Sequence, residues 1–176
     1  MTLDRRTWAL GAGVAVAAAA AGTGGWLWRQ RNASAAETQL WAASFQTPAG
    51  APLVMATFRG RPLLLNFWAT WCPPCVREMP AIDRFAREVS GRGWNVVGLA
   101  ADNLEPVRDF LALRPVSYAI GLTGFAGIEL SKTLGNGAGG LPFTLLLGRD
   151  GRVLQRRSGE IDAAQLSAWA AAIDAG

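Results

Sequence analysis

Histidine is absent from the 176 residues of the chain. Its absence excludes Ser-His-Asp hydrolysis, Cys-His proteolysis, HExxH zinc chemistry and haem held by histidine. Charged residues make up only 17% of the sequence against 51% hydrophobic residues, which is too apolar for a disordered chain. The length fits one ordinary domain plus a short segment. Any chemistry must therefore use Cys, Asp, Glu, Lys, Arg or the backbone.

A basic patch interleaved with aromatic residues is also lacking. The net charge is +4, and residues 1–36 hold four arginines against one aspartate, which accounts for +3 of it. The rest of the chain is therefore nearly neutral. Because a basic patch is the electrostatic signature of nucleic-acid binding, we expect no nucleic-acid partner.

Cysteine is scarce, and its two copies stand together as Cys72 and Cys75. A disulfide that closes so short a loop constrains the unfolded chain little, so stability is a poor reason for the pair. A structural zinc site needs about four ligands, and covalent haem attachment needs a histidine where Val76 stands. We therefore expect no metal and no cofactor. The pair predicts a redox site, with a Cu(I) thiolate site or an inert disulfide as the alternatives.

The N-terminal segment is the longest stretch without charge, from residue 7 to residue 28. A helix of this length spans roughly the 30 Å hydrocarbon core of a bilayer. Trp8 lies at one end and Trp28 at the other, where aromatic rings prefer the membrane interface. We predict that residues 1–29 form an uncleaved membrane anchor.

Two alternatives to the anchor follow from the same segment. Residues 9–21 resemble the apolar part of a signal peptide, and cleavage near Ala35 would release a soluble exported domain. Arg29 and Arg31 lie between these two features and argue against cleavage. An amphipathic or buried helix is the third interpretation. Residues 30–39 are small and polar and predict a linker, so we expect the folded domain over residues 40–176.

Beyond the linker, apolar runs alternate with amphipathic stretches, which predicts strands alternating with helices. An Asp-Gly pair between two apolar runs predicts a hairpin. The order implies a parallel βαβ unit joined to an antiparallel ββα unit, an α/β fold with a mixed central sheet and helices on both faces. The expected strands are 63–68, 94–100, 142–147 and 152–157, and the expected helices are 75–90, 105–113, 125–134 and 162–173.

The cysteine pair falls where the first buried strand gives way to a helix. Cys72 would sit at the helix N-terminus, where unpaired N–H groups and the helix dipole stabilise a thiolate. Cys75, one turn later, would be more enclosed. Pro73 and Pro74 suit the first helical positions, but they withhold two N–H donors from the sulfur.

Residues 65–75, LNFWATWCPPC, followed by Glu78 and Pro80, resemble the TlpA/ResA branch of the thioredoxin-like thiol:disulfide oxidoreductases. Residues 140–144 and 150–152 match the same branch. The resemblance implies a thioredoxin fold that faces the periplasm, anchored by residues 7–28. It also implies a redox-active disulfide in which Cys72 attacks and Cys75 resolves the mixed disulfide.

The resemblance assigns further residues to this site. Pro142 matches the family's cis-proline, which packs against the disulfide and presents backbone to the substrate, and we expect Leu141 and Trp71 to join it in binding substrate. For Trp71, core packing is the alternative. Pro80 matches a proline that kinks the active-site helix, and the alternative is that it ends a first short turn.

One position departs from thioredoxin itself. Where thioredoxin has a buried aspartate, six residues before its first cysteine, this chain has Asn66, which cannot accept a proton. Glu78 is the nearest ionisable substitute and is typical of the TlpA/ResA branch. It follows Cys75 by three residues, so their Cβ atoms would lie about 5–6 Å apart on a helix. We expect Glu78 to take the proton of Cys75, and a glutamate that faces solvent is the alternative.

The combined prediction is a membrane-anchored periplasmic enzyme that reduces protein disulfides. Its expected partners are an exported protein that bears a disulfide, such as apocytochrome c, and a membrane-side reductase that supplies electrons. A thiol peroxidase is the alternative within enzymes, although no separate peroxidatic cysteine is present. A metallochaperone-like module that binds Cu(I) through Cys72, Cys75 and Met79 is the alternative from another class.

Overall fold

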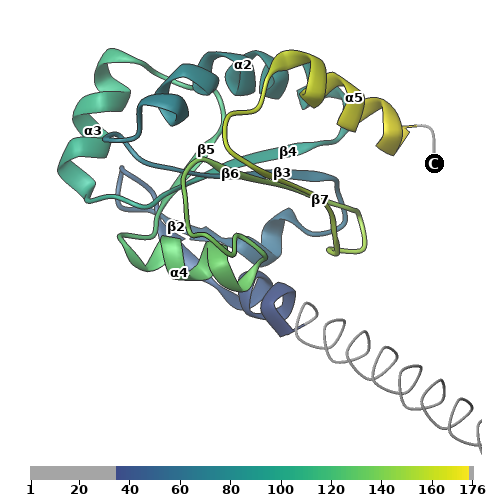
Figure 1. Cartoon of the computed structure of the whole chain (residues 1–176), viewed down its shortest axis with the longest axis horizontal. Helices are drawn as coiled ribbons and strands as arrows, with labels where there is room; N and C mark the ends of the chain where they lie inside the picture. The colour runs from purple at the N-terminus through teal and green to yellow at the C-terminus, as the bar shows by residue number, and fades with distance from the viewer. Residues whose placement is uncertain (1–34, 175–176) are drawn as a thin grey trace, which may run out of the picture. The chain divides into compact units, whose positions relative to one another are not determined.

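The computed structural model describes residues 35–174, so the predicted anchor lies outside the described residues. A seven-stranded sheet forms the centre of the domain, with strand order β2-β1-β5-β4-β3-β6-β7 (Figure 1). Strands β3, β4 and β5 run parallel, and β6 runs antiparallel to β3 and β7. The predicted mixed sheet is therefore confirmed. The strands are β1 Ser44–Gln46, β2 Pro52–Val54, β3 Leu63–Trp68, β4 Asn95–Ala100, β5 Ala119–Leu122, β6 Phe143–Leu147 and β7 Val153–Ser158.

Helices cover both faces of the sheet, as expected (Figure 1). Helices α2, α3 and α5 contribute to the hydrophobic core on one face, and α4 with the helical residues 35–42 contributes to the core on the other. The helices are α2 Pro73–Val89, α3 Leu104–Leu113, α4 Ala126–Thr133 and α5 Ala163–Asp174, with short 3-10 turns η1 Met55–Phe58 and η2 Ser90–Arg92.

Strand β3 carries both cores because it lies in the middle of the sheet and is buried along its whole length. Successive strand residues point to opposite faces. Leu64 and Trp68 accordingly belong to the core under α2, whereas Leu65 and Phe67 belong to the opposite core. The apolar run of this strand predicts such two-sided burial correctly.

The predicted elements after residue 60 all occur, with ends that shift by a few residues. The hairpin of β6 and β7 turns at the Asp150-Gly151 pair, where Gly151 has a φ of 83° that suits glycine. The closing helix is capped as expected, because the Asp162 carboxylate accepts the N–H of Gln165 at 2.8 Å. Among residues 35–174, no helix combines the length and the apolar character that a membrane crossing requires.

The second half of the predicted linker differs from the expectation. Residues 35–42 are helical, and Ala36, Leu40 and Trp41 are buried in the core of their face of the sheet. The polar residues between them suggested a linker, but the apolar side chains recur at helical spacing. Strands β1, β2 and β5 were not anticipated either, because three or four residues are too few to show a period.

Candidate active site

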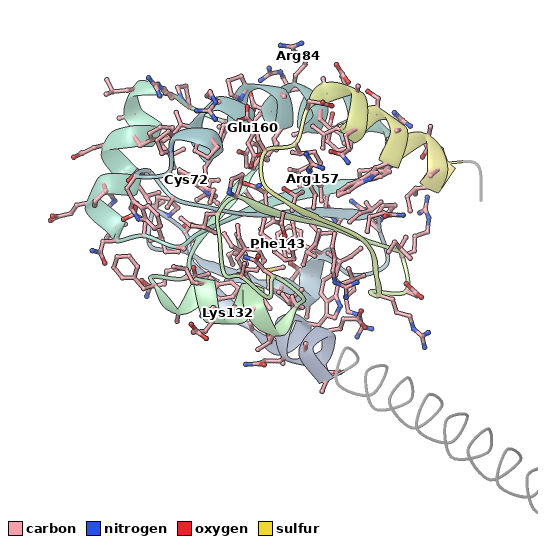
Figure 2. All side chains as sticks on the ribbon, in the orientation of Figure 1. Cys72, Arg84, Lys132, Phe143, Arg157 and Glu160 are labelled. Carbon is pink, nitrogen blue, oxygen red and sulfur yellow. A yellow bond between two sulfur atoms is a disulfide. The ribbon has the colours of Figure 1, made fainter. Side chains whose placement is uncertain are left out.

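Cys72 and Cys75 form a disulfide at the start of α2, with a Cα–Cα distance of 5.3 Å. Cys72 is the N-cap residue of the helix, and its Sγ accepts the N–H of Cys75 at 3.3 Å. The expectation that Cys72 lies at the helix N-terminus is therefore confirmed. Figure 2 shows Cys72 where the ribbon enters α2 from the sheet.

The residues after Cys72 form the first turn of the helix. Pro73 and Pro74 occupy the first two helical positions, so the backbone N–H of Cys75 is the donor that reaches the sulfur. The helix then continues past Pro80 to Val89 without interruption. The alternative in which Pro80 ends a short turn is therefore wrong.

The disulfide is mostly enclosed. Cys75 is fully buried, Cys72 is 4% exposed, and the neighbouring Trp71 is 54% exposed. The greater enclosure of Cys75 agrees with the expectation. Since most of its side chain lies in solvent, Trp71 is not a core residue.

The Leu141–Pro142 peptide bond is cis, as the resemblance implies. The pairing of Phe67 with Phe143 places the start of β6 beside the end of β3, so Pro142 lies at the same end of the sheet as the disulfide. Its carbonyl accepts the N–H of Gly159 at 2.9 Å. The Leu141 backbone, in contrast, forms no hydrogen bond with any residue of the described chain.

Glu78 lies in α2, three residues after Cys75, and is only 2% exposed, so the solvent-facing alternative is wrong. One carboxylate oxygen accepts the side-chain N–H of Asn66 at 2.7 Å, and the other accepts the backbone N–H of Ile161 at 2.8 Å. Asn66 also donates to the hydroxyl of Thr144 at 3.0 Å. The structure thus joins Asn66 directly to Glu78, a contact that the sequence analysis did not foresee.

Burial sets the acidity of this carboxyl group. Removal from water raises the pKa of Glu78 from 4.5 to about 7, and the negative charge of Glu160 adds to the rise. The hydrogen bonds from Ile161 and Asn66 oppose it because they stabilise the carboxylate. A carboxyl group with a pKa near 7 both accepts and releases a proton at neutral pH.

A second carboxylate near the site, Asp102, was missed by the sequence analysis. It is 5% exposed and accepts the backbone N–H of Thr70 at 3.0 Å, the hydroxyl of Thr70 at 2.5 Å and the N–H of Asn103 at 2.8 Å. These bonds join the loop that carries the disulfide to the loop after β4. The available signal is an aspartate in the short loop between a buried strand and a helix.

Exposed apolar side chains gather where the parallel strands end. Trp71, Leu104 and Phe125 follow β3, β4 and β5 and are 54%, 37% and 58% exposed. The carboxyl ends of parallel strands share one end of the sheet, where the loop before Pro142 also lies. We call these loops, with the disulfide, the disulfide end. Leu104 and Phe125 were not anticipated, because sequence patterns alone do not reveal which apolar residues stay exposed.

Known proteins match the chain over the same region. The Redoxin family matches residues 35–173. The thiol-disulfide oxidoreductase ResA of Bacillus thuringiensis subsp. konkukian is 31% identical over 121 residues, which cover 68% of each protein. The thiol:disulfide interchange protein DsbE of Tatumella citrea is 34% identical over 68% of this chain and 62% of its own length.

Solved structures agree with the sequence relatives. A thioredoxin-related protein from Neisseria meningitidis serogroup B is 29% identical and superposes with a TM-score of 0.67, over 76% of this chain and all of its own. A thioredoxin family thiol:disulfide interchange protein from Chlorobium tepidum gives a TM-score of 0.67 at 25% identity, over 74% of this chain and 92% of its own. The fold is thioredoxin-like. The chain therefore belongs to the Redoxin family, as a thiol:disulfide oxidoreductase of its TlpA/ResA-like branch.

Proposed function

We propose that the chain is a membrane-anchored enzyme of the periplasm that reduces disulfides of exported proteins through Cys72 and Cys75. The observation that carries this proposal is the disulfide at the N-cap of α2, where Cys72 Sγ accepts the N–H of Cys75. The same N–H and the helix dipole would stabilise a Cys72 thiolate after reduction of the pair.

The proposed reaction has two exchange steps. The Cys72 thiolate attacks one sulfur of the target disulfide, which forms a mixed disulfide and releases the other target sulfur as a thiolate. Cys75 then loses its proton and attacks Cys72 Sγ, which closes the Cys72–Cys75 disulfide and releases the second target thiolate. The target gains two electrons, the enzyme loses two, and a membrane-side reductase returns them.

Glu78 is the proposed proton acceptor for the second step. It follows Cys75 by three residues on α2, which places the two side chains on the same helix face. Burial raises the pKa of a thiol, so Cys75 needs a nearby base. With a pKa of about 7, Glu78 is partly ionised at neutral pH, so its carboxylate can accept the proton of Cys75 and later release it.

The substrate would bind along the Leu141 backbone and the exposed face of Trp71. The carbonyl of Pro142 is already bonded to Gly159, whereas the N–H and C=O of Leu141 have no partner in the described chain. An extended segment next to the target disulfide would satisfy both groups. Trp71 supplies a half-exposed apolar surface beside Cys72 for the same segment.

The proposed direction of electron transfer, from the enzyme to its target, and the proposed periplasmic location both rest on the N-terminal segment. Residues 7–28 have the length and composition of a membrane span, and exported compartments are oxidising. A reductase there needs a steady electron supply, which tethering beside a membrane donor would provide. The reduction potential is expected near the roughly −270 mV of thioredoxin, and a value near the roughly −120 mV of a strong periplasmic oxidant would overturn the proposed direction.

Substrate trapping tests the assignment of the two cysteines. Cys75→Ser should accumulate a mixed disulfide through Cys72, because the resolving thiol is missing, and turnover of insulin disulfides should fall to background. Cys72→Ser is the matched control and should trap nothing. Equal trapping by both variants would contradict the proposed order of attack, and full turnover by either would contradict the two-thiol mechanism.

A further inference from the structure

Four arginines gather at the end of the sheet opposite the disulfide. Arg59 and Arg61 precede β3, and Arg149 and Arg152 lie in the turn between β6 and β7. The pairing of Leu63 with Leu147 brings these two segments side by side. All four side chains are exposed. We call Arg59, Arg61, Arg149 and Arg152 the arginine end.

The positive charge of the arginine end is only partly neutralised. Within residues 35–174, Arg61 and Arg149 form no ion pair or hydrogen bond through their guanidinium groups. Two carboxylates lie nearby, and each also accepts a backbone N–H. Asp150 accepts from Arg152 at 3.0 Å, and Glu37 accepts from Val153 at 2.8 Å. Four cations therefore face two anions, and the surface keeps a net positive charge.

The described chain begins at this same end. The indole N–H of Trp41, in the helix of residues 35–42, donates to the carbonyl of Gly151 at 2.8 Å. The guanidinium of Arg59 lies 5.5 Å from the centre of the Trp41 ring and donates to the carbonyl of Asp150 at 3.3 Å. Residues 29–34, between the predicted span and this helix, reach at most roughly 20 Å when fully extended. With the anchor of the proposed function inserted in a bilayer, so short a tether would keep the arginine end near the membrane surface.

We propose that the arginine end docks on a bilayer surface that contains anionic phospholipid and so holds the disulfide end away from the membrane. This inference rests on the membrane anchor of the proposed function. Each arginine near an anionic surface shifts a docking equilibrium by roughly fivefold, which corresponds to about 1 kcal/mol. Strand β3 rises about 3.3 Å per residue over its length, so roughly 20 Å of strand separates the two ends.

Energy transfer from the domain to the bilayer tests this orientation. The full chain with Cys72→Ser and Cys75→Ser receives a single thiol at the exposed disulfide end through Phe125→Cys, and that thiol carries a donor fluorophore. Vesicles of phosphatidylcholine, with or without phosphatidylglycerol, carry acceptor dye on their headgroups. We expect less transfer with phosphatidylglycerol, and salt near 1 M should abolish the difference because the screening length falls to about 3 Å.

Charge reversal identifies the surface responsible. Arg61→Glu with Arg149→Glu should lower the docked-to-undocked ratio by at least roughly 30-fold, about 1 kcal/mol for each lost arginine, and remove the lipid dependence. Arg84→Glu with Lys132→Glu makes the same change in net charge, but on the outer sides of α2 and α4 (Figure 2). This control double variant should preserve the lipid dependence of energy transfer. Equal transfer from both lipids, or equal loss in both double variants, would overturn the proposal.

Vesicle flotation separates this inference from the anchor. A chain that floats with neither lipid contradicts the proposed anchor and the docking together. A chain that floats with both lipids but shows no lipid dependence of transfer keeps the anchor and contradicts the docking alone. A chain that floats only with phosphatidylglycerol, and only while Arg61 and Arg149 are intact, contradicts the anchor and supports the docking.

Discussion

The two ends of the sheet differ in what they expose and in what they bury. The disulfide end exposes apolar side chains such as Trp71 and Phe125 and buries two carboxylates, Glu78 and Asp102. The arginine end exposes cations and leaves Asp150 60% exposed. For Glu78 the cost of removal from water outweighs its hydrogen bonds and raises its pKa to about 7. Glu78 therefore supplies a group that exchanges protons near neutral pH beside the disulfide.

The largest expected difference between the ends concerns pH. The unfolded chain loses the Glu78 proton through pH 4.5, whereas the folded protein keeps it until about pH 7. The folded state thus binds more protons in this window, and the free energy of unfolding should fall as pH rises through it, by about 3 kcal/mol. Glu78→Gln cannot titrate and should flatten this fall, measured by urea unfolding of the oxidised protein at pH 4–8.

The matched control removes a carboxylate from the arginine end. Asp150→Asn makes the same change from carboxylate to amide at an exposed site and serves as the reference for the Glu78→Gln profile. Glu78→Gln should also slow the release of reduced target in single turnover above pH 7, where the wild-type carboxylate is mostly ionised. Parallel unfolding profiles for the wild type and Glu78→Gln would contradict the raised pKa of Glu78 and its role as a proton acceptor.

Asp102→Ala gives the next largest effect. It leaves three donors of Thr70 and Asn103 without their acceptor at a nearly buried site, which should cost about 2 kcal/mol of stability. Thr70→Val removes only the hydroxyl and should cost about half as much. Denaturant unfolding measures the stability of both variants. A smaller loss of stability in Asp102→Ala than in Thr70→Val would show that the carboxylate does not hold the two loops together.

Trp71→Ala tests the exposed apolar surface of the disulfide end. Truncation of an exposed tryptophan at a binding surface should raise the KM for a protein disulfide by roughly tenfold, without loss of stability. Leu113→Ala is the control, because Leu113 is 85% exposed at the end of α3 and outside this surface. Equal KM values for the two variants would place substrate binding elsewhere.

The smallest effect is expected at the arginine end. Arg61→Glu with Arg149→Glu should change the stability in solution by no more than about 0.5 kcal/mol, since neither guanidinium has a partner in the described chain. Turnover of a soluble disulfide substrate should also equal that of the wild type. A clear loss of solution turnover would mean that the arginine end contributes to the chemistry.

Much of this architecture was predictable from local pattern. The buried run of β3, the amphipathic stripe of α2 and the Asp-Gly turn each follow from a few consecutive residues. The position of Cys72 at a helix N-terminus follows from the same reasoning. The sequence pattern did not predict helix 35–42, because its buried side chains, such as Leu40, alternate with residues that are common in linkers.

The contacts that define the acidity of the site were not predictable in this way. Glu78 meets Asn66 from 12 residues away and Ile161 from 83 residues away, and only the folded chain brings the three together. The same holds for the clustering of Arg61 with Arg149, which depends on the pairing of β3 with β6. Periodicity reports which face of an element is buried, but not which elements meet.

The two outermost strands, β2 and β7, are poor templates for further strand pairing. Strand β2 is only three residues long and contains Pro52, which lacks an N–H donor. Strand β7 exposes Arg156 and Arg157, and its pairing with β6 is irregular beside Leu147. Charge, brevity and irregularity at sheet borders discourage edge-to-edge aggregation. A thiol:disulfide oxidoreductase with such borders can meet exposed strands of other chains without recruiting them into its own sheet.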